Sequence, residues 1–220
     1  MRVPKCGAPI FARLAYMSRI LVPLTGLVCL SLSPVFAGEP LTQGQRDFLM
    51  SHMHATRKQF LDATAGLTPA QWTFKAGADR WSIAECAEHI SAAEGFIWGM
   101  VEKLVAGPAA DAAMIEQTKG KDQILVKMVP DRTNKFQAPE PIQPKKLLSD
   151  PTEYVMKFKT LRDEHIHWVE TTQDSLLDKV APHPAAGPLN AYQWILLMSG
   201  HTERHVKQIL EVKDDPNYPK

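Results

Sequence analysis

Cysteine is scarce in this chain, and the shortage limits how covalent bonds contribute to the fold. The 220 residues include three cysteines, Cys6, Cys29 and Cys86. The first two lie in residues 1–37, which we expect to be removed as a signal peptide. Cleavage would leave Cys86 alone and exclude an intrachain disulfide, so the sequence predicts a domain that depends on packing even in an oxidising compartment.

Acidic residues and a long apolar run are both missing from residues 1–37. Four basic residues and no acid precede or flank a short apolar run, and the segment ends in Val35-Phe36-Ala37. These are the features of a secretory signal peptide, and the run is too short for a comfortable membrane span. We predict cleavage after Ala37 and a periplasmic or secreted protein. An uncleaved N-terminal anchor is the alternative, because Pro23 and Pro34 lie in the apolar region.

Neither sign of charge predominates. The chain has 25 basic and 24 acidic residues, and loss of the four basic residues in residues 1–37 would leave a net charge of −3. A slightly acidic surface argues against a nucleic-acid partner. We expect residues 38–220 to form one domain that acts on a small molecule, with no stable membrane span after signal removal. A homodimer is compatible with this composition.

Internal repeats and convincing alternating strands are absent, whereas helical periodicity is clear. Ser82 is a predicted N-cap, with Glu85 three residues later as its capping-box partner. Prolines between residues 130 and 144 forbid a long helix there and predict a crossover packed over the bundle. The sequence therefore predicts an all-α four-helix bundle with a long crossover between helices 2 and 3. The predicted helices cover about residues 42–65, 82–106, 151–169 and 190–212.

The main chemical signal is the histidine pair His201 and His205 in the fourth helix, with His89 in the second. Residues four apart share a helix face, so both imidazoles of the pair can reach one metal ion. Helical wheels place all three on apolar faces. Burying three imidazoles costs free energy unless each finds a partner, and one divalent cation satisfies all three. The wheels place Phe96 on the face of His89, and Glu88, Ser91, Glu102, Glu203, Arg204, Lys207 and Glu211 toward solvent.

Other readings of this pattern are open or disfavoured. A zinc protease uses a glutamate directly after the first histidine of the pair, but Thr202 occupies that position. Di-iron bundles use Glu-x-x-His motifs, and none of the three inward histidines has a glutamate three residues before it. Histidines that are simply hydrogen-bonded in the core are the alternative to a metal site.

Two segments together resemble a known family. Residues 81–89 read Trp-Ser-Ile-Ala-Glu-Cys-Ala-Glu-His, Ala-Ala-Glu follows at residues 92–94, and the His-x-x-x-His pair leads to Gln208-Ile209. This pattern resembles DinB-like proteins over about residues 41–213. The resemblance implies a four-helix bundle with a three-histidine divalent metal site, related to thiol-dependent transferases and a maleylpyruvate isomerase. It implies His89, His201 and His205 as the ligands, with water at the open positions.

Several other residues have more than one role open. Glu85 is either a fourth ligand, a contact to a ligand or only a cap. His165 and His52 either join the site or are core residues, and Gln208 is interpreted as a contact behind a ligand or a pocket group. For Cys86, inert packing is favoured over a reactive thiol. Surface positions are predicted for His54, His167 and His183.

An open three-histidine site is typical of a catalytic metal, which polarises a carbonyl or lowers the pKa of a bound water. We therefore expect an exported hydrolase or transferase that uses zinc, nickel or iron on a small molecule. Low-molecular-weight thiols are chiefly cytoplasmic, so export slightly favours hydrolysis over thiol transfer. A non-catalytic module with a structural metal, and an interaction domain that has lost its cofactor, are the alternatives.

Overall fold

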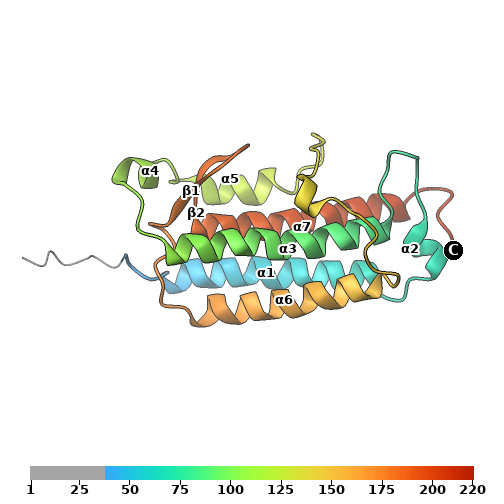
Figure 1. Ribbon diagram of the computed structural model, residues 1–220, viewed down its shortest axis with the longest axis horizontal. Coiled ribbons are helices and arrows are strands. Elements are labelled where there is room, and N and C mark those ends of the chain that lie inside the picture. The colour runs from blue at the N-terminus through green and yellow to red at the C-terminus, as the bar shows by residue number, and fades with distance from the viewer. Residues whose placement is uncertain (1–37) are drawn as a thin grey trace, which may run out of the picture. The chain divides into compact units, whose positions relative to one another are not determined.

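The structure of the protein, a computed structural model, describes residues 38–220. Its long helices α1 (Gln43–Thr64), α3 (Ile83–Ala106), α6 (Thr152–Thr171) and α7 (Ala191–Lys213) form a four-helix bundle (Figure 1). This confirms the predicted all-α fold and its long crossover between α3 and α6. The signal peptide predicted for residues 1–37 lies outside the described residues and stays a prediction.

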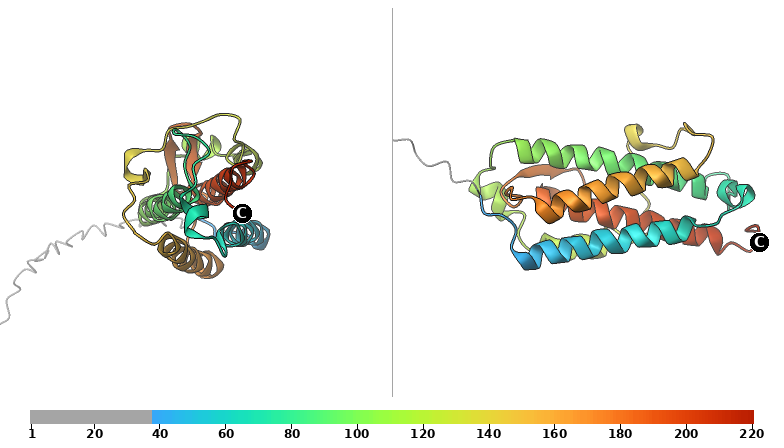
Figure 2. Two further views of the ribbon diagram at one scale, coloured as in Figure 1. Left: turned by 90° about the vertical axis from the view of Figure 1, so that its right-hand side faces the viewer. Right: turned by 90° about the horizontal axis from the view of Figure 1, so that it is seen from below.

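Of the packed pairs of long helices in the bundle, only α3 and α6 are consecutive in the chain. Seen end-on, α7 lies beside both α1 and α3, and α6 completes the square (Figure 2). The colour gradient shows that α1 and α7 run in one direction and α3 and α6 in the other (Figure 1). Because α3 and α7 are antiparallel neighbours, the first half of α3 lies beside the second half of α7.

Side-chain caps fix the start of three long helices. At α3, Ser82 Oγ accepts from the backbone N–H of Glu85 at 3.2 Å, and Glu85 Oε2 accepts from the N–H of Ser82 at 2.8 Å. This is the predicted capping box. The same reciprocal pair of bonds starts α1 and α7. Each cap satisfies N–H groups that a helix start leaves unpaired and contributes about 1 kcal/mol.

The prediction that the chain has no strand was wrong for residues 180–190. Here β1 (Val180–His183) and β2 (Gly187–Asn190) pair antiparallel, with Pro182 opposite Pro188. Each strand has four residues, and prolines interrupt the apolar alternation that would identify it from sequence. Gly187 has a φ of +68°, which a residue with a side chain rarely adopts. The other short elements are α2 (Pro69–Thr73), α4 (Ala112–Glu116), α5 (Lys121–Met128) and the 3-10 turn η1 (Glu140–Ile142).

The crossover covers the side of α7 that faces away from the other long helices. The helix α5 packs on α7 (Figure 1). Gly200 permits this approach, because a Cβ there would lie 3.1 Å from Cβ of Val129, closer than ordinary van der Waals contact. The wheel treated this side of α7 as solvent. The prediction that Arg204 faces solvent was therefore wrong, because Arg204 lies beneath the crossover and is only 9% exposed.

The helix α3 departs from its predicted faces for a similar reason. Glu88 is buried, and its carboxylate accepts from the backbone N–H groups of Lys145 and Lys146, both at 2.9 Å. Ser91 is buried as well, and Phe96 is 47% exposed instead of facing the core. The loop that follows η1 thus covers a side of α3 that the wheel assigned to solvent.

Cys86 lies in an apolar part of the bundle core. Its side chain is fully buried, and burial raises the pKa of the thiol far above its usual range. A thiol that stays protonated is a poor nucleophile, which agrees with the inert role predicted for it. Within residues 38–220, no helix combines the length and apolar character that a membrane span requires.

Candidate metal centre

The three predicted histidines converge between α3 and α7. The Nε2 atoms of His89 and His201 are 3.1 Å apart. The ring of His205 lies 4.4 Å from that of His89 and 4.5 Å from that of His201, measured between centroids. Each ring offers a nitrogen, and these three nitrogens lie within 4.8 Å of one another. His89 and His205 are buried, whereas His201 is half-buried.

The crossover orients the ring of His89. Its Nδ1 lies 2.7 Å from the backbone carbonyl oxygen of Ile142 in η1. Since a carbonyl only accepts hydrogen bonds, Nδ1 carries the ring proton and Nε2 keeps its lone pair. That lone pair is on the nitrogen that approaches His201. His89 is therefore held in the tautomer that binds a metal through Nε2.

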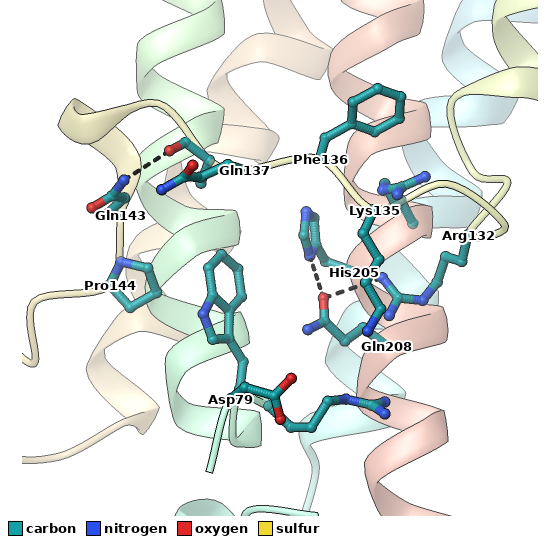
Figure 3. Close-up of a pocket in the computed structure, with 13 residues that line it drawn as sticks. Asp79, Arg132, Lys135, Phe136, Gln137, Gln143, Pro144, His205 and Gln208 are labelled. Atoms are coloured by element: carbon teal, nitrogen blue, oxygen red, sulfur yellow. Dashed lines mark hydrogen bonds between the residues drawn. The ribbon is translucent and has the colours of Figure 1, made fainter. Parts of the chain in front are cut away.

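A two-step chain of hydrogen bonds orients His205 in the same way. Its Nδ1 lies 2.9 Å from Gln208 Oε1, and Arg132 Nη1 donates to the same oxygen at 3.2 Å (Figure 3). A guanidinium has only donors, so Arg132 fixes the oxygen of the Gln208 amide toward itself. His205 must then donate from Nδ1, which leaves Nε2 unprotonated. This supports the interpretation of Gln208 as a contact behind a ligand.

Burial keeps all three imidazoles neutral. Desolvation lowers the pKa of His89, lowers that of His201 to about 3, and lowers that of His205 well below its usual value. The neighbouring histidines lower the pKa values of His201 and His205 further. A neutral ring is the form that ligates a metal, so no proton has to be displaced from these ligands near pH 7.

A solvent-accessible pocket adjoins the histidines. Its volume is about 410 Å³, and His205 and Gln208 form part of its wall (Figure 3). The indole of Trp81 stacks on the ring of His205, with centroids 5.8 Å apart and planes inclined by 22°. One face of this histidine is thus covered by an aromatic side chain. The other lining residues are Asp79, Arg80, Arg132, Lys135, Phe136, Gln137, Ala138, Gln143, Pro144 and Arg204.

The remaining candidate ligands lie elsewhere. Glu85 caps α3 and forms an ion pair with Lys75 at 3.1 Å. Its side chain therefore acts as a cap, and not as a fourth ligand or as a contact to a ligand. His52 packs edge-on against Phe48 and is outside the histidine group. As predicted, His54 and His167 are exposed, but His183 is half-buried against Trp194.

His165 belongs to a buried polar network instead of the metal site. Its Nδ1 lies 2.8 Å from Glu94 Oε1, and its ring stacks on Trp98 with centroids 3.9 Å apart. Arg162 donates to both oxygens of Glu94, at 2.7 and 2.6 Å, and also to Thr202 Oγ1 at 3.0 Å. Thr202 follows the ligand candidate His201, so this network fixes α7 next to the site.

Sequence reasoning found Gln208 but missed the other residues that support the histidines. Arg162 could have been found, because it lies between Phe158 and His165 on the apolar stripe of α6, where a charge requires a buried partner. Arg132 and the carbonyl of Ile142 had no such signal. Both belong to the crossover, whose path over α3 and α7 has no periodic pattern.

The sequence of this chain matches a known protein family. The family model of the DinB superfamily matches residues 52–209, a span that includes all three histidines, and the chain belongs to this superfamily. The uncharacterized protein YuaE of Bacillus subtilis (strain 168) is 24% identical over 165 residues, which are 75% of this chain and 97% of YuaE.

A solved structure shares the fold. The protein is similar to YfiT from Bacillus subtilis, with a TM-score of 0.53 and 12% identity over 83% of this chain and 93% of YfiT. YfiT is described as "a probable metal-dependent hydrolase with an unusual four-helix bundle topology". At this identity the likeness concerns the fold alone.

Proposed function

We propose that the protein is an exported metal-dependent hydrolase or transferase that acts on a small molecule, and that His89, His201 and His205 hold a divalent ion. The observation that carries the proposal is the convergence of three ring nitrogens within 4.8 Å beside an accessible pocket. The description of YfiT supports the same chemistry for a protein of this fold.

The donor set fits a transition metal. Neutral imidazoles suit zinc, nickel and iron, and backbone and side-chain acceptors already hold two of the rings in the required tautomer. A bound ion would supply Lewis-acid chemistry, which polarises a carbonyl or activates water. Among residues 38–220, no carboxylate or cysteine joins the three histidines as a fourth ligand. This favours an open, catalytic site over a closed, structural one.

The chain's own residues define access and orientation. Gln208 and Ile142 hold the histidine rings, and Trp81 shields one face of His205. The pocket volume of about 410 Å³ suits a small molecule. Hydrolysis is preferred to thiol transfer because the basic, apolar segment at residues 1–37 supports export to a compartment poor in thiol cosubstrates.

Elemental analysis of protein purified without a histidine tag tests the metal site. We expect about one divalent ion per chain in the wild type and loss of most of it in His89→Ala and His205→Ala. His54→Ala, which removes an exposed histidine, is the matched control and should retain the ion. Equal, substoichiometric metal in the wild type and both site variants would refute the proposal.

Two further measurements test catalysis and export. Hydrolysis of small activated esters should disappear on chelation and return when the metal is added back; ester hydrolysis that persists after complete metal removal would count against a metal-dependent hydrolase.

A fusion of residues 1–60 to a reporter that is active only outside the cytoplasm tests export. A reporter that stays inactive there, although the fusion is made in full, would overturn the assignment of residues 1–37.

A further inference from the structure

Positive charge is concentrated in the pocket beside the histidines. Four cationic side chains line it, those of Arg80, Arg132, Lys135 and Arg204, against a single lining carboxylate, Asp79. The predicted mature chain is slightly acidic as a whole, so this concentration is not a reflection of overall composition. Figure 3 shows Arg132 and Lys135 on the same side of the pocket as His205.

One carboxylate outside the pocket lining neutralises part of this charge. Glu211 accepts from Arg132 Nη2 at 2.8 Å and from Arg80 Nη2 at 3.2 Å. Two guanidinium groups therefore share one negative charge. Arg132 also donates to Gln208, so its position is fixed by partners on α7.

Within residues 38–220, the other two cations, Arg204 and Lys135, form no ion pair with a carboxylate. Arg204 donates to the backbone carbonyls of Val129, Asp131 and Asn134, which accept hydrogen bonds but carry no net charge. The carboxylate of Asp131 instead accepts from the backbone N–H of Thr133 at 2.9 Å. Neither Arg204 nor Lys135 forms an ion pair with any residue in the described part of the chain. Burial and the neighbouring Arg132 lower the pKa of Arg204, and the Asp131 and Glu211 carboxylates offset this lowering only in part.

We propose that this pocket binds an oxyanion, a carboxylate or phosphate group of the substrate, and that Lys135 is a residue that contacts it. The proposal rests on the proposed function, to which it adds the substrate class. Counting Glu211 and the Asp131 carboxylate near Arg204, four cations face three anions, so one anionic group would restore the balance. Because His205 and Lys135 line one cavity, an anion held by Lys135 lies in the same pocket as His205, one of the three candidate metal ligands.

Binding of inorganic phosphate and of acetate to metal-free protein tests the inference. The indole N–H signal of Trp81, assigned with Trp81→Phe, reports on the pocket in ¹H–¹⁵N spectra at constant ionic strength. We expect at least one of the two anions to shift this signal saturably, with a dissociation constant in the millimolar range. The stronger response identifies the preferred group, phosphate or carboxylate. Working without metal separates this test from the test of the metal site.

Charge variants establish whether Lys135 is responsible. An exposed charge contact is worth up to about 1 kcal/mol, so Lys135→Gln should weaken binding up to about fivefold and Lys135→Glu about tenfold. Lys127→Glu is the matched control, because this exposed lysine lies on α5 away from the pocket lining, and it should leave binding nearly unchanged. If neither anion shifts Trp81, if Lys135→Glu binds as the wild type does, or if Lys127→Glu weakens binding equally, the inference is overturned.

Discussion

Replacing Gln208 by leucine should weaken metal binding although the three histidines remain. The substitution removes the acceptor that holds the proton of His205 on Nδ1, at 2.9 Å, and breaks the link from His205 to Arg132. Without it the ring is free to rotate or to change tautomer, and the proton can move to Nε2, the nitrogen expected to bind the ion.

The magnitude follows from the role of such supporting contacts. Loss of the group behind a ligand typically lowers metal affinity 10–100-fold, or about 1.4–2.7 kcal/mol. The first ligand, His89, keeps its bond to Ile142, so the loss should stay below that caused by removing a histidine. Gln208→Glu retains an acceptor for Nδ1 and should bind at least as tightly as Gln208→Leu.

Competition for zinc against a chromophoric chelator measures the affinity. The matched control is Gln137→Leu, which alters an exposed glutamine of the same pocket that does not contact a histidine. We expect a near wild-type affinity for the control. An affinity of Gln208→Leu within threefold of the wild type, in protein that is fully folded, would show that the hydrogen-bond chain does not prepare the site.

Two further predictions concern stability. Glu94→Gln leaves the fully buried Arg162 without its counter-charge, so the free energy of unfolding in urea should fall by about 3–5 kcal/mol; a loss below about 1 kcal/mol would contradict this role for the pair. In metal-free protein, the pKa of His201 is lower in the folded chain than in the unfolded chain. Below about pH 6.5 the unfolded chain therefore binds more protons, and the free energy of unfolding decreases as the pH is lowered. The loss from His201 alone should reach up to about 2 kcal/mol between pH 7 and 5 and should shrink in His201→Gln, whereas equal stability at both pH values would refute it.

The sequence was sufficient for features that depend on local periodicity or capping. Ser82 and Glu85 predict the start of α3, because a capping box consists of two such residues three positions apart. The structure contains that capping box. The spacing of His201 and His205 places both rings on one face of α7 without knowledge of the fold. The juxtaposition with His89 followed from treating both helices as amphipathic, and it is confirmed as geometry. Metal binding itself stays a prediction.

Positions that the crossover covers could not be predicted in this way. A helical wheel assigns one side to solvent, but Arg204 and Glu88 lie on sides that residues 129–147 cover. Their polar groups are satisfied by backbone groups of that segment, a partnership that leaves no periodic trace in the sequence. The pairing of Glu94 with Arg162 is likewise a contact between distant helices. Sequence reasoning therefore located the histidines and Gln208 but missed the other residues that hold them.

The antiparallel contact of α3 with α7 joins His89 to a ligand candidate 112 residues later in the chain. Translation delivers the two partners at widely separated times, so a nascent chain that lacks α7 has only one of the three nitrogens. A chain secreted in unfolded form would cross the membrane before the triad assembles. The ion would then be drawn from the supply of the destination compartment, whose free metal concentrations would decide which element the purified protein contains.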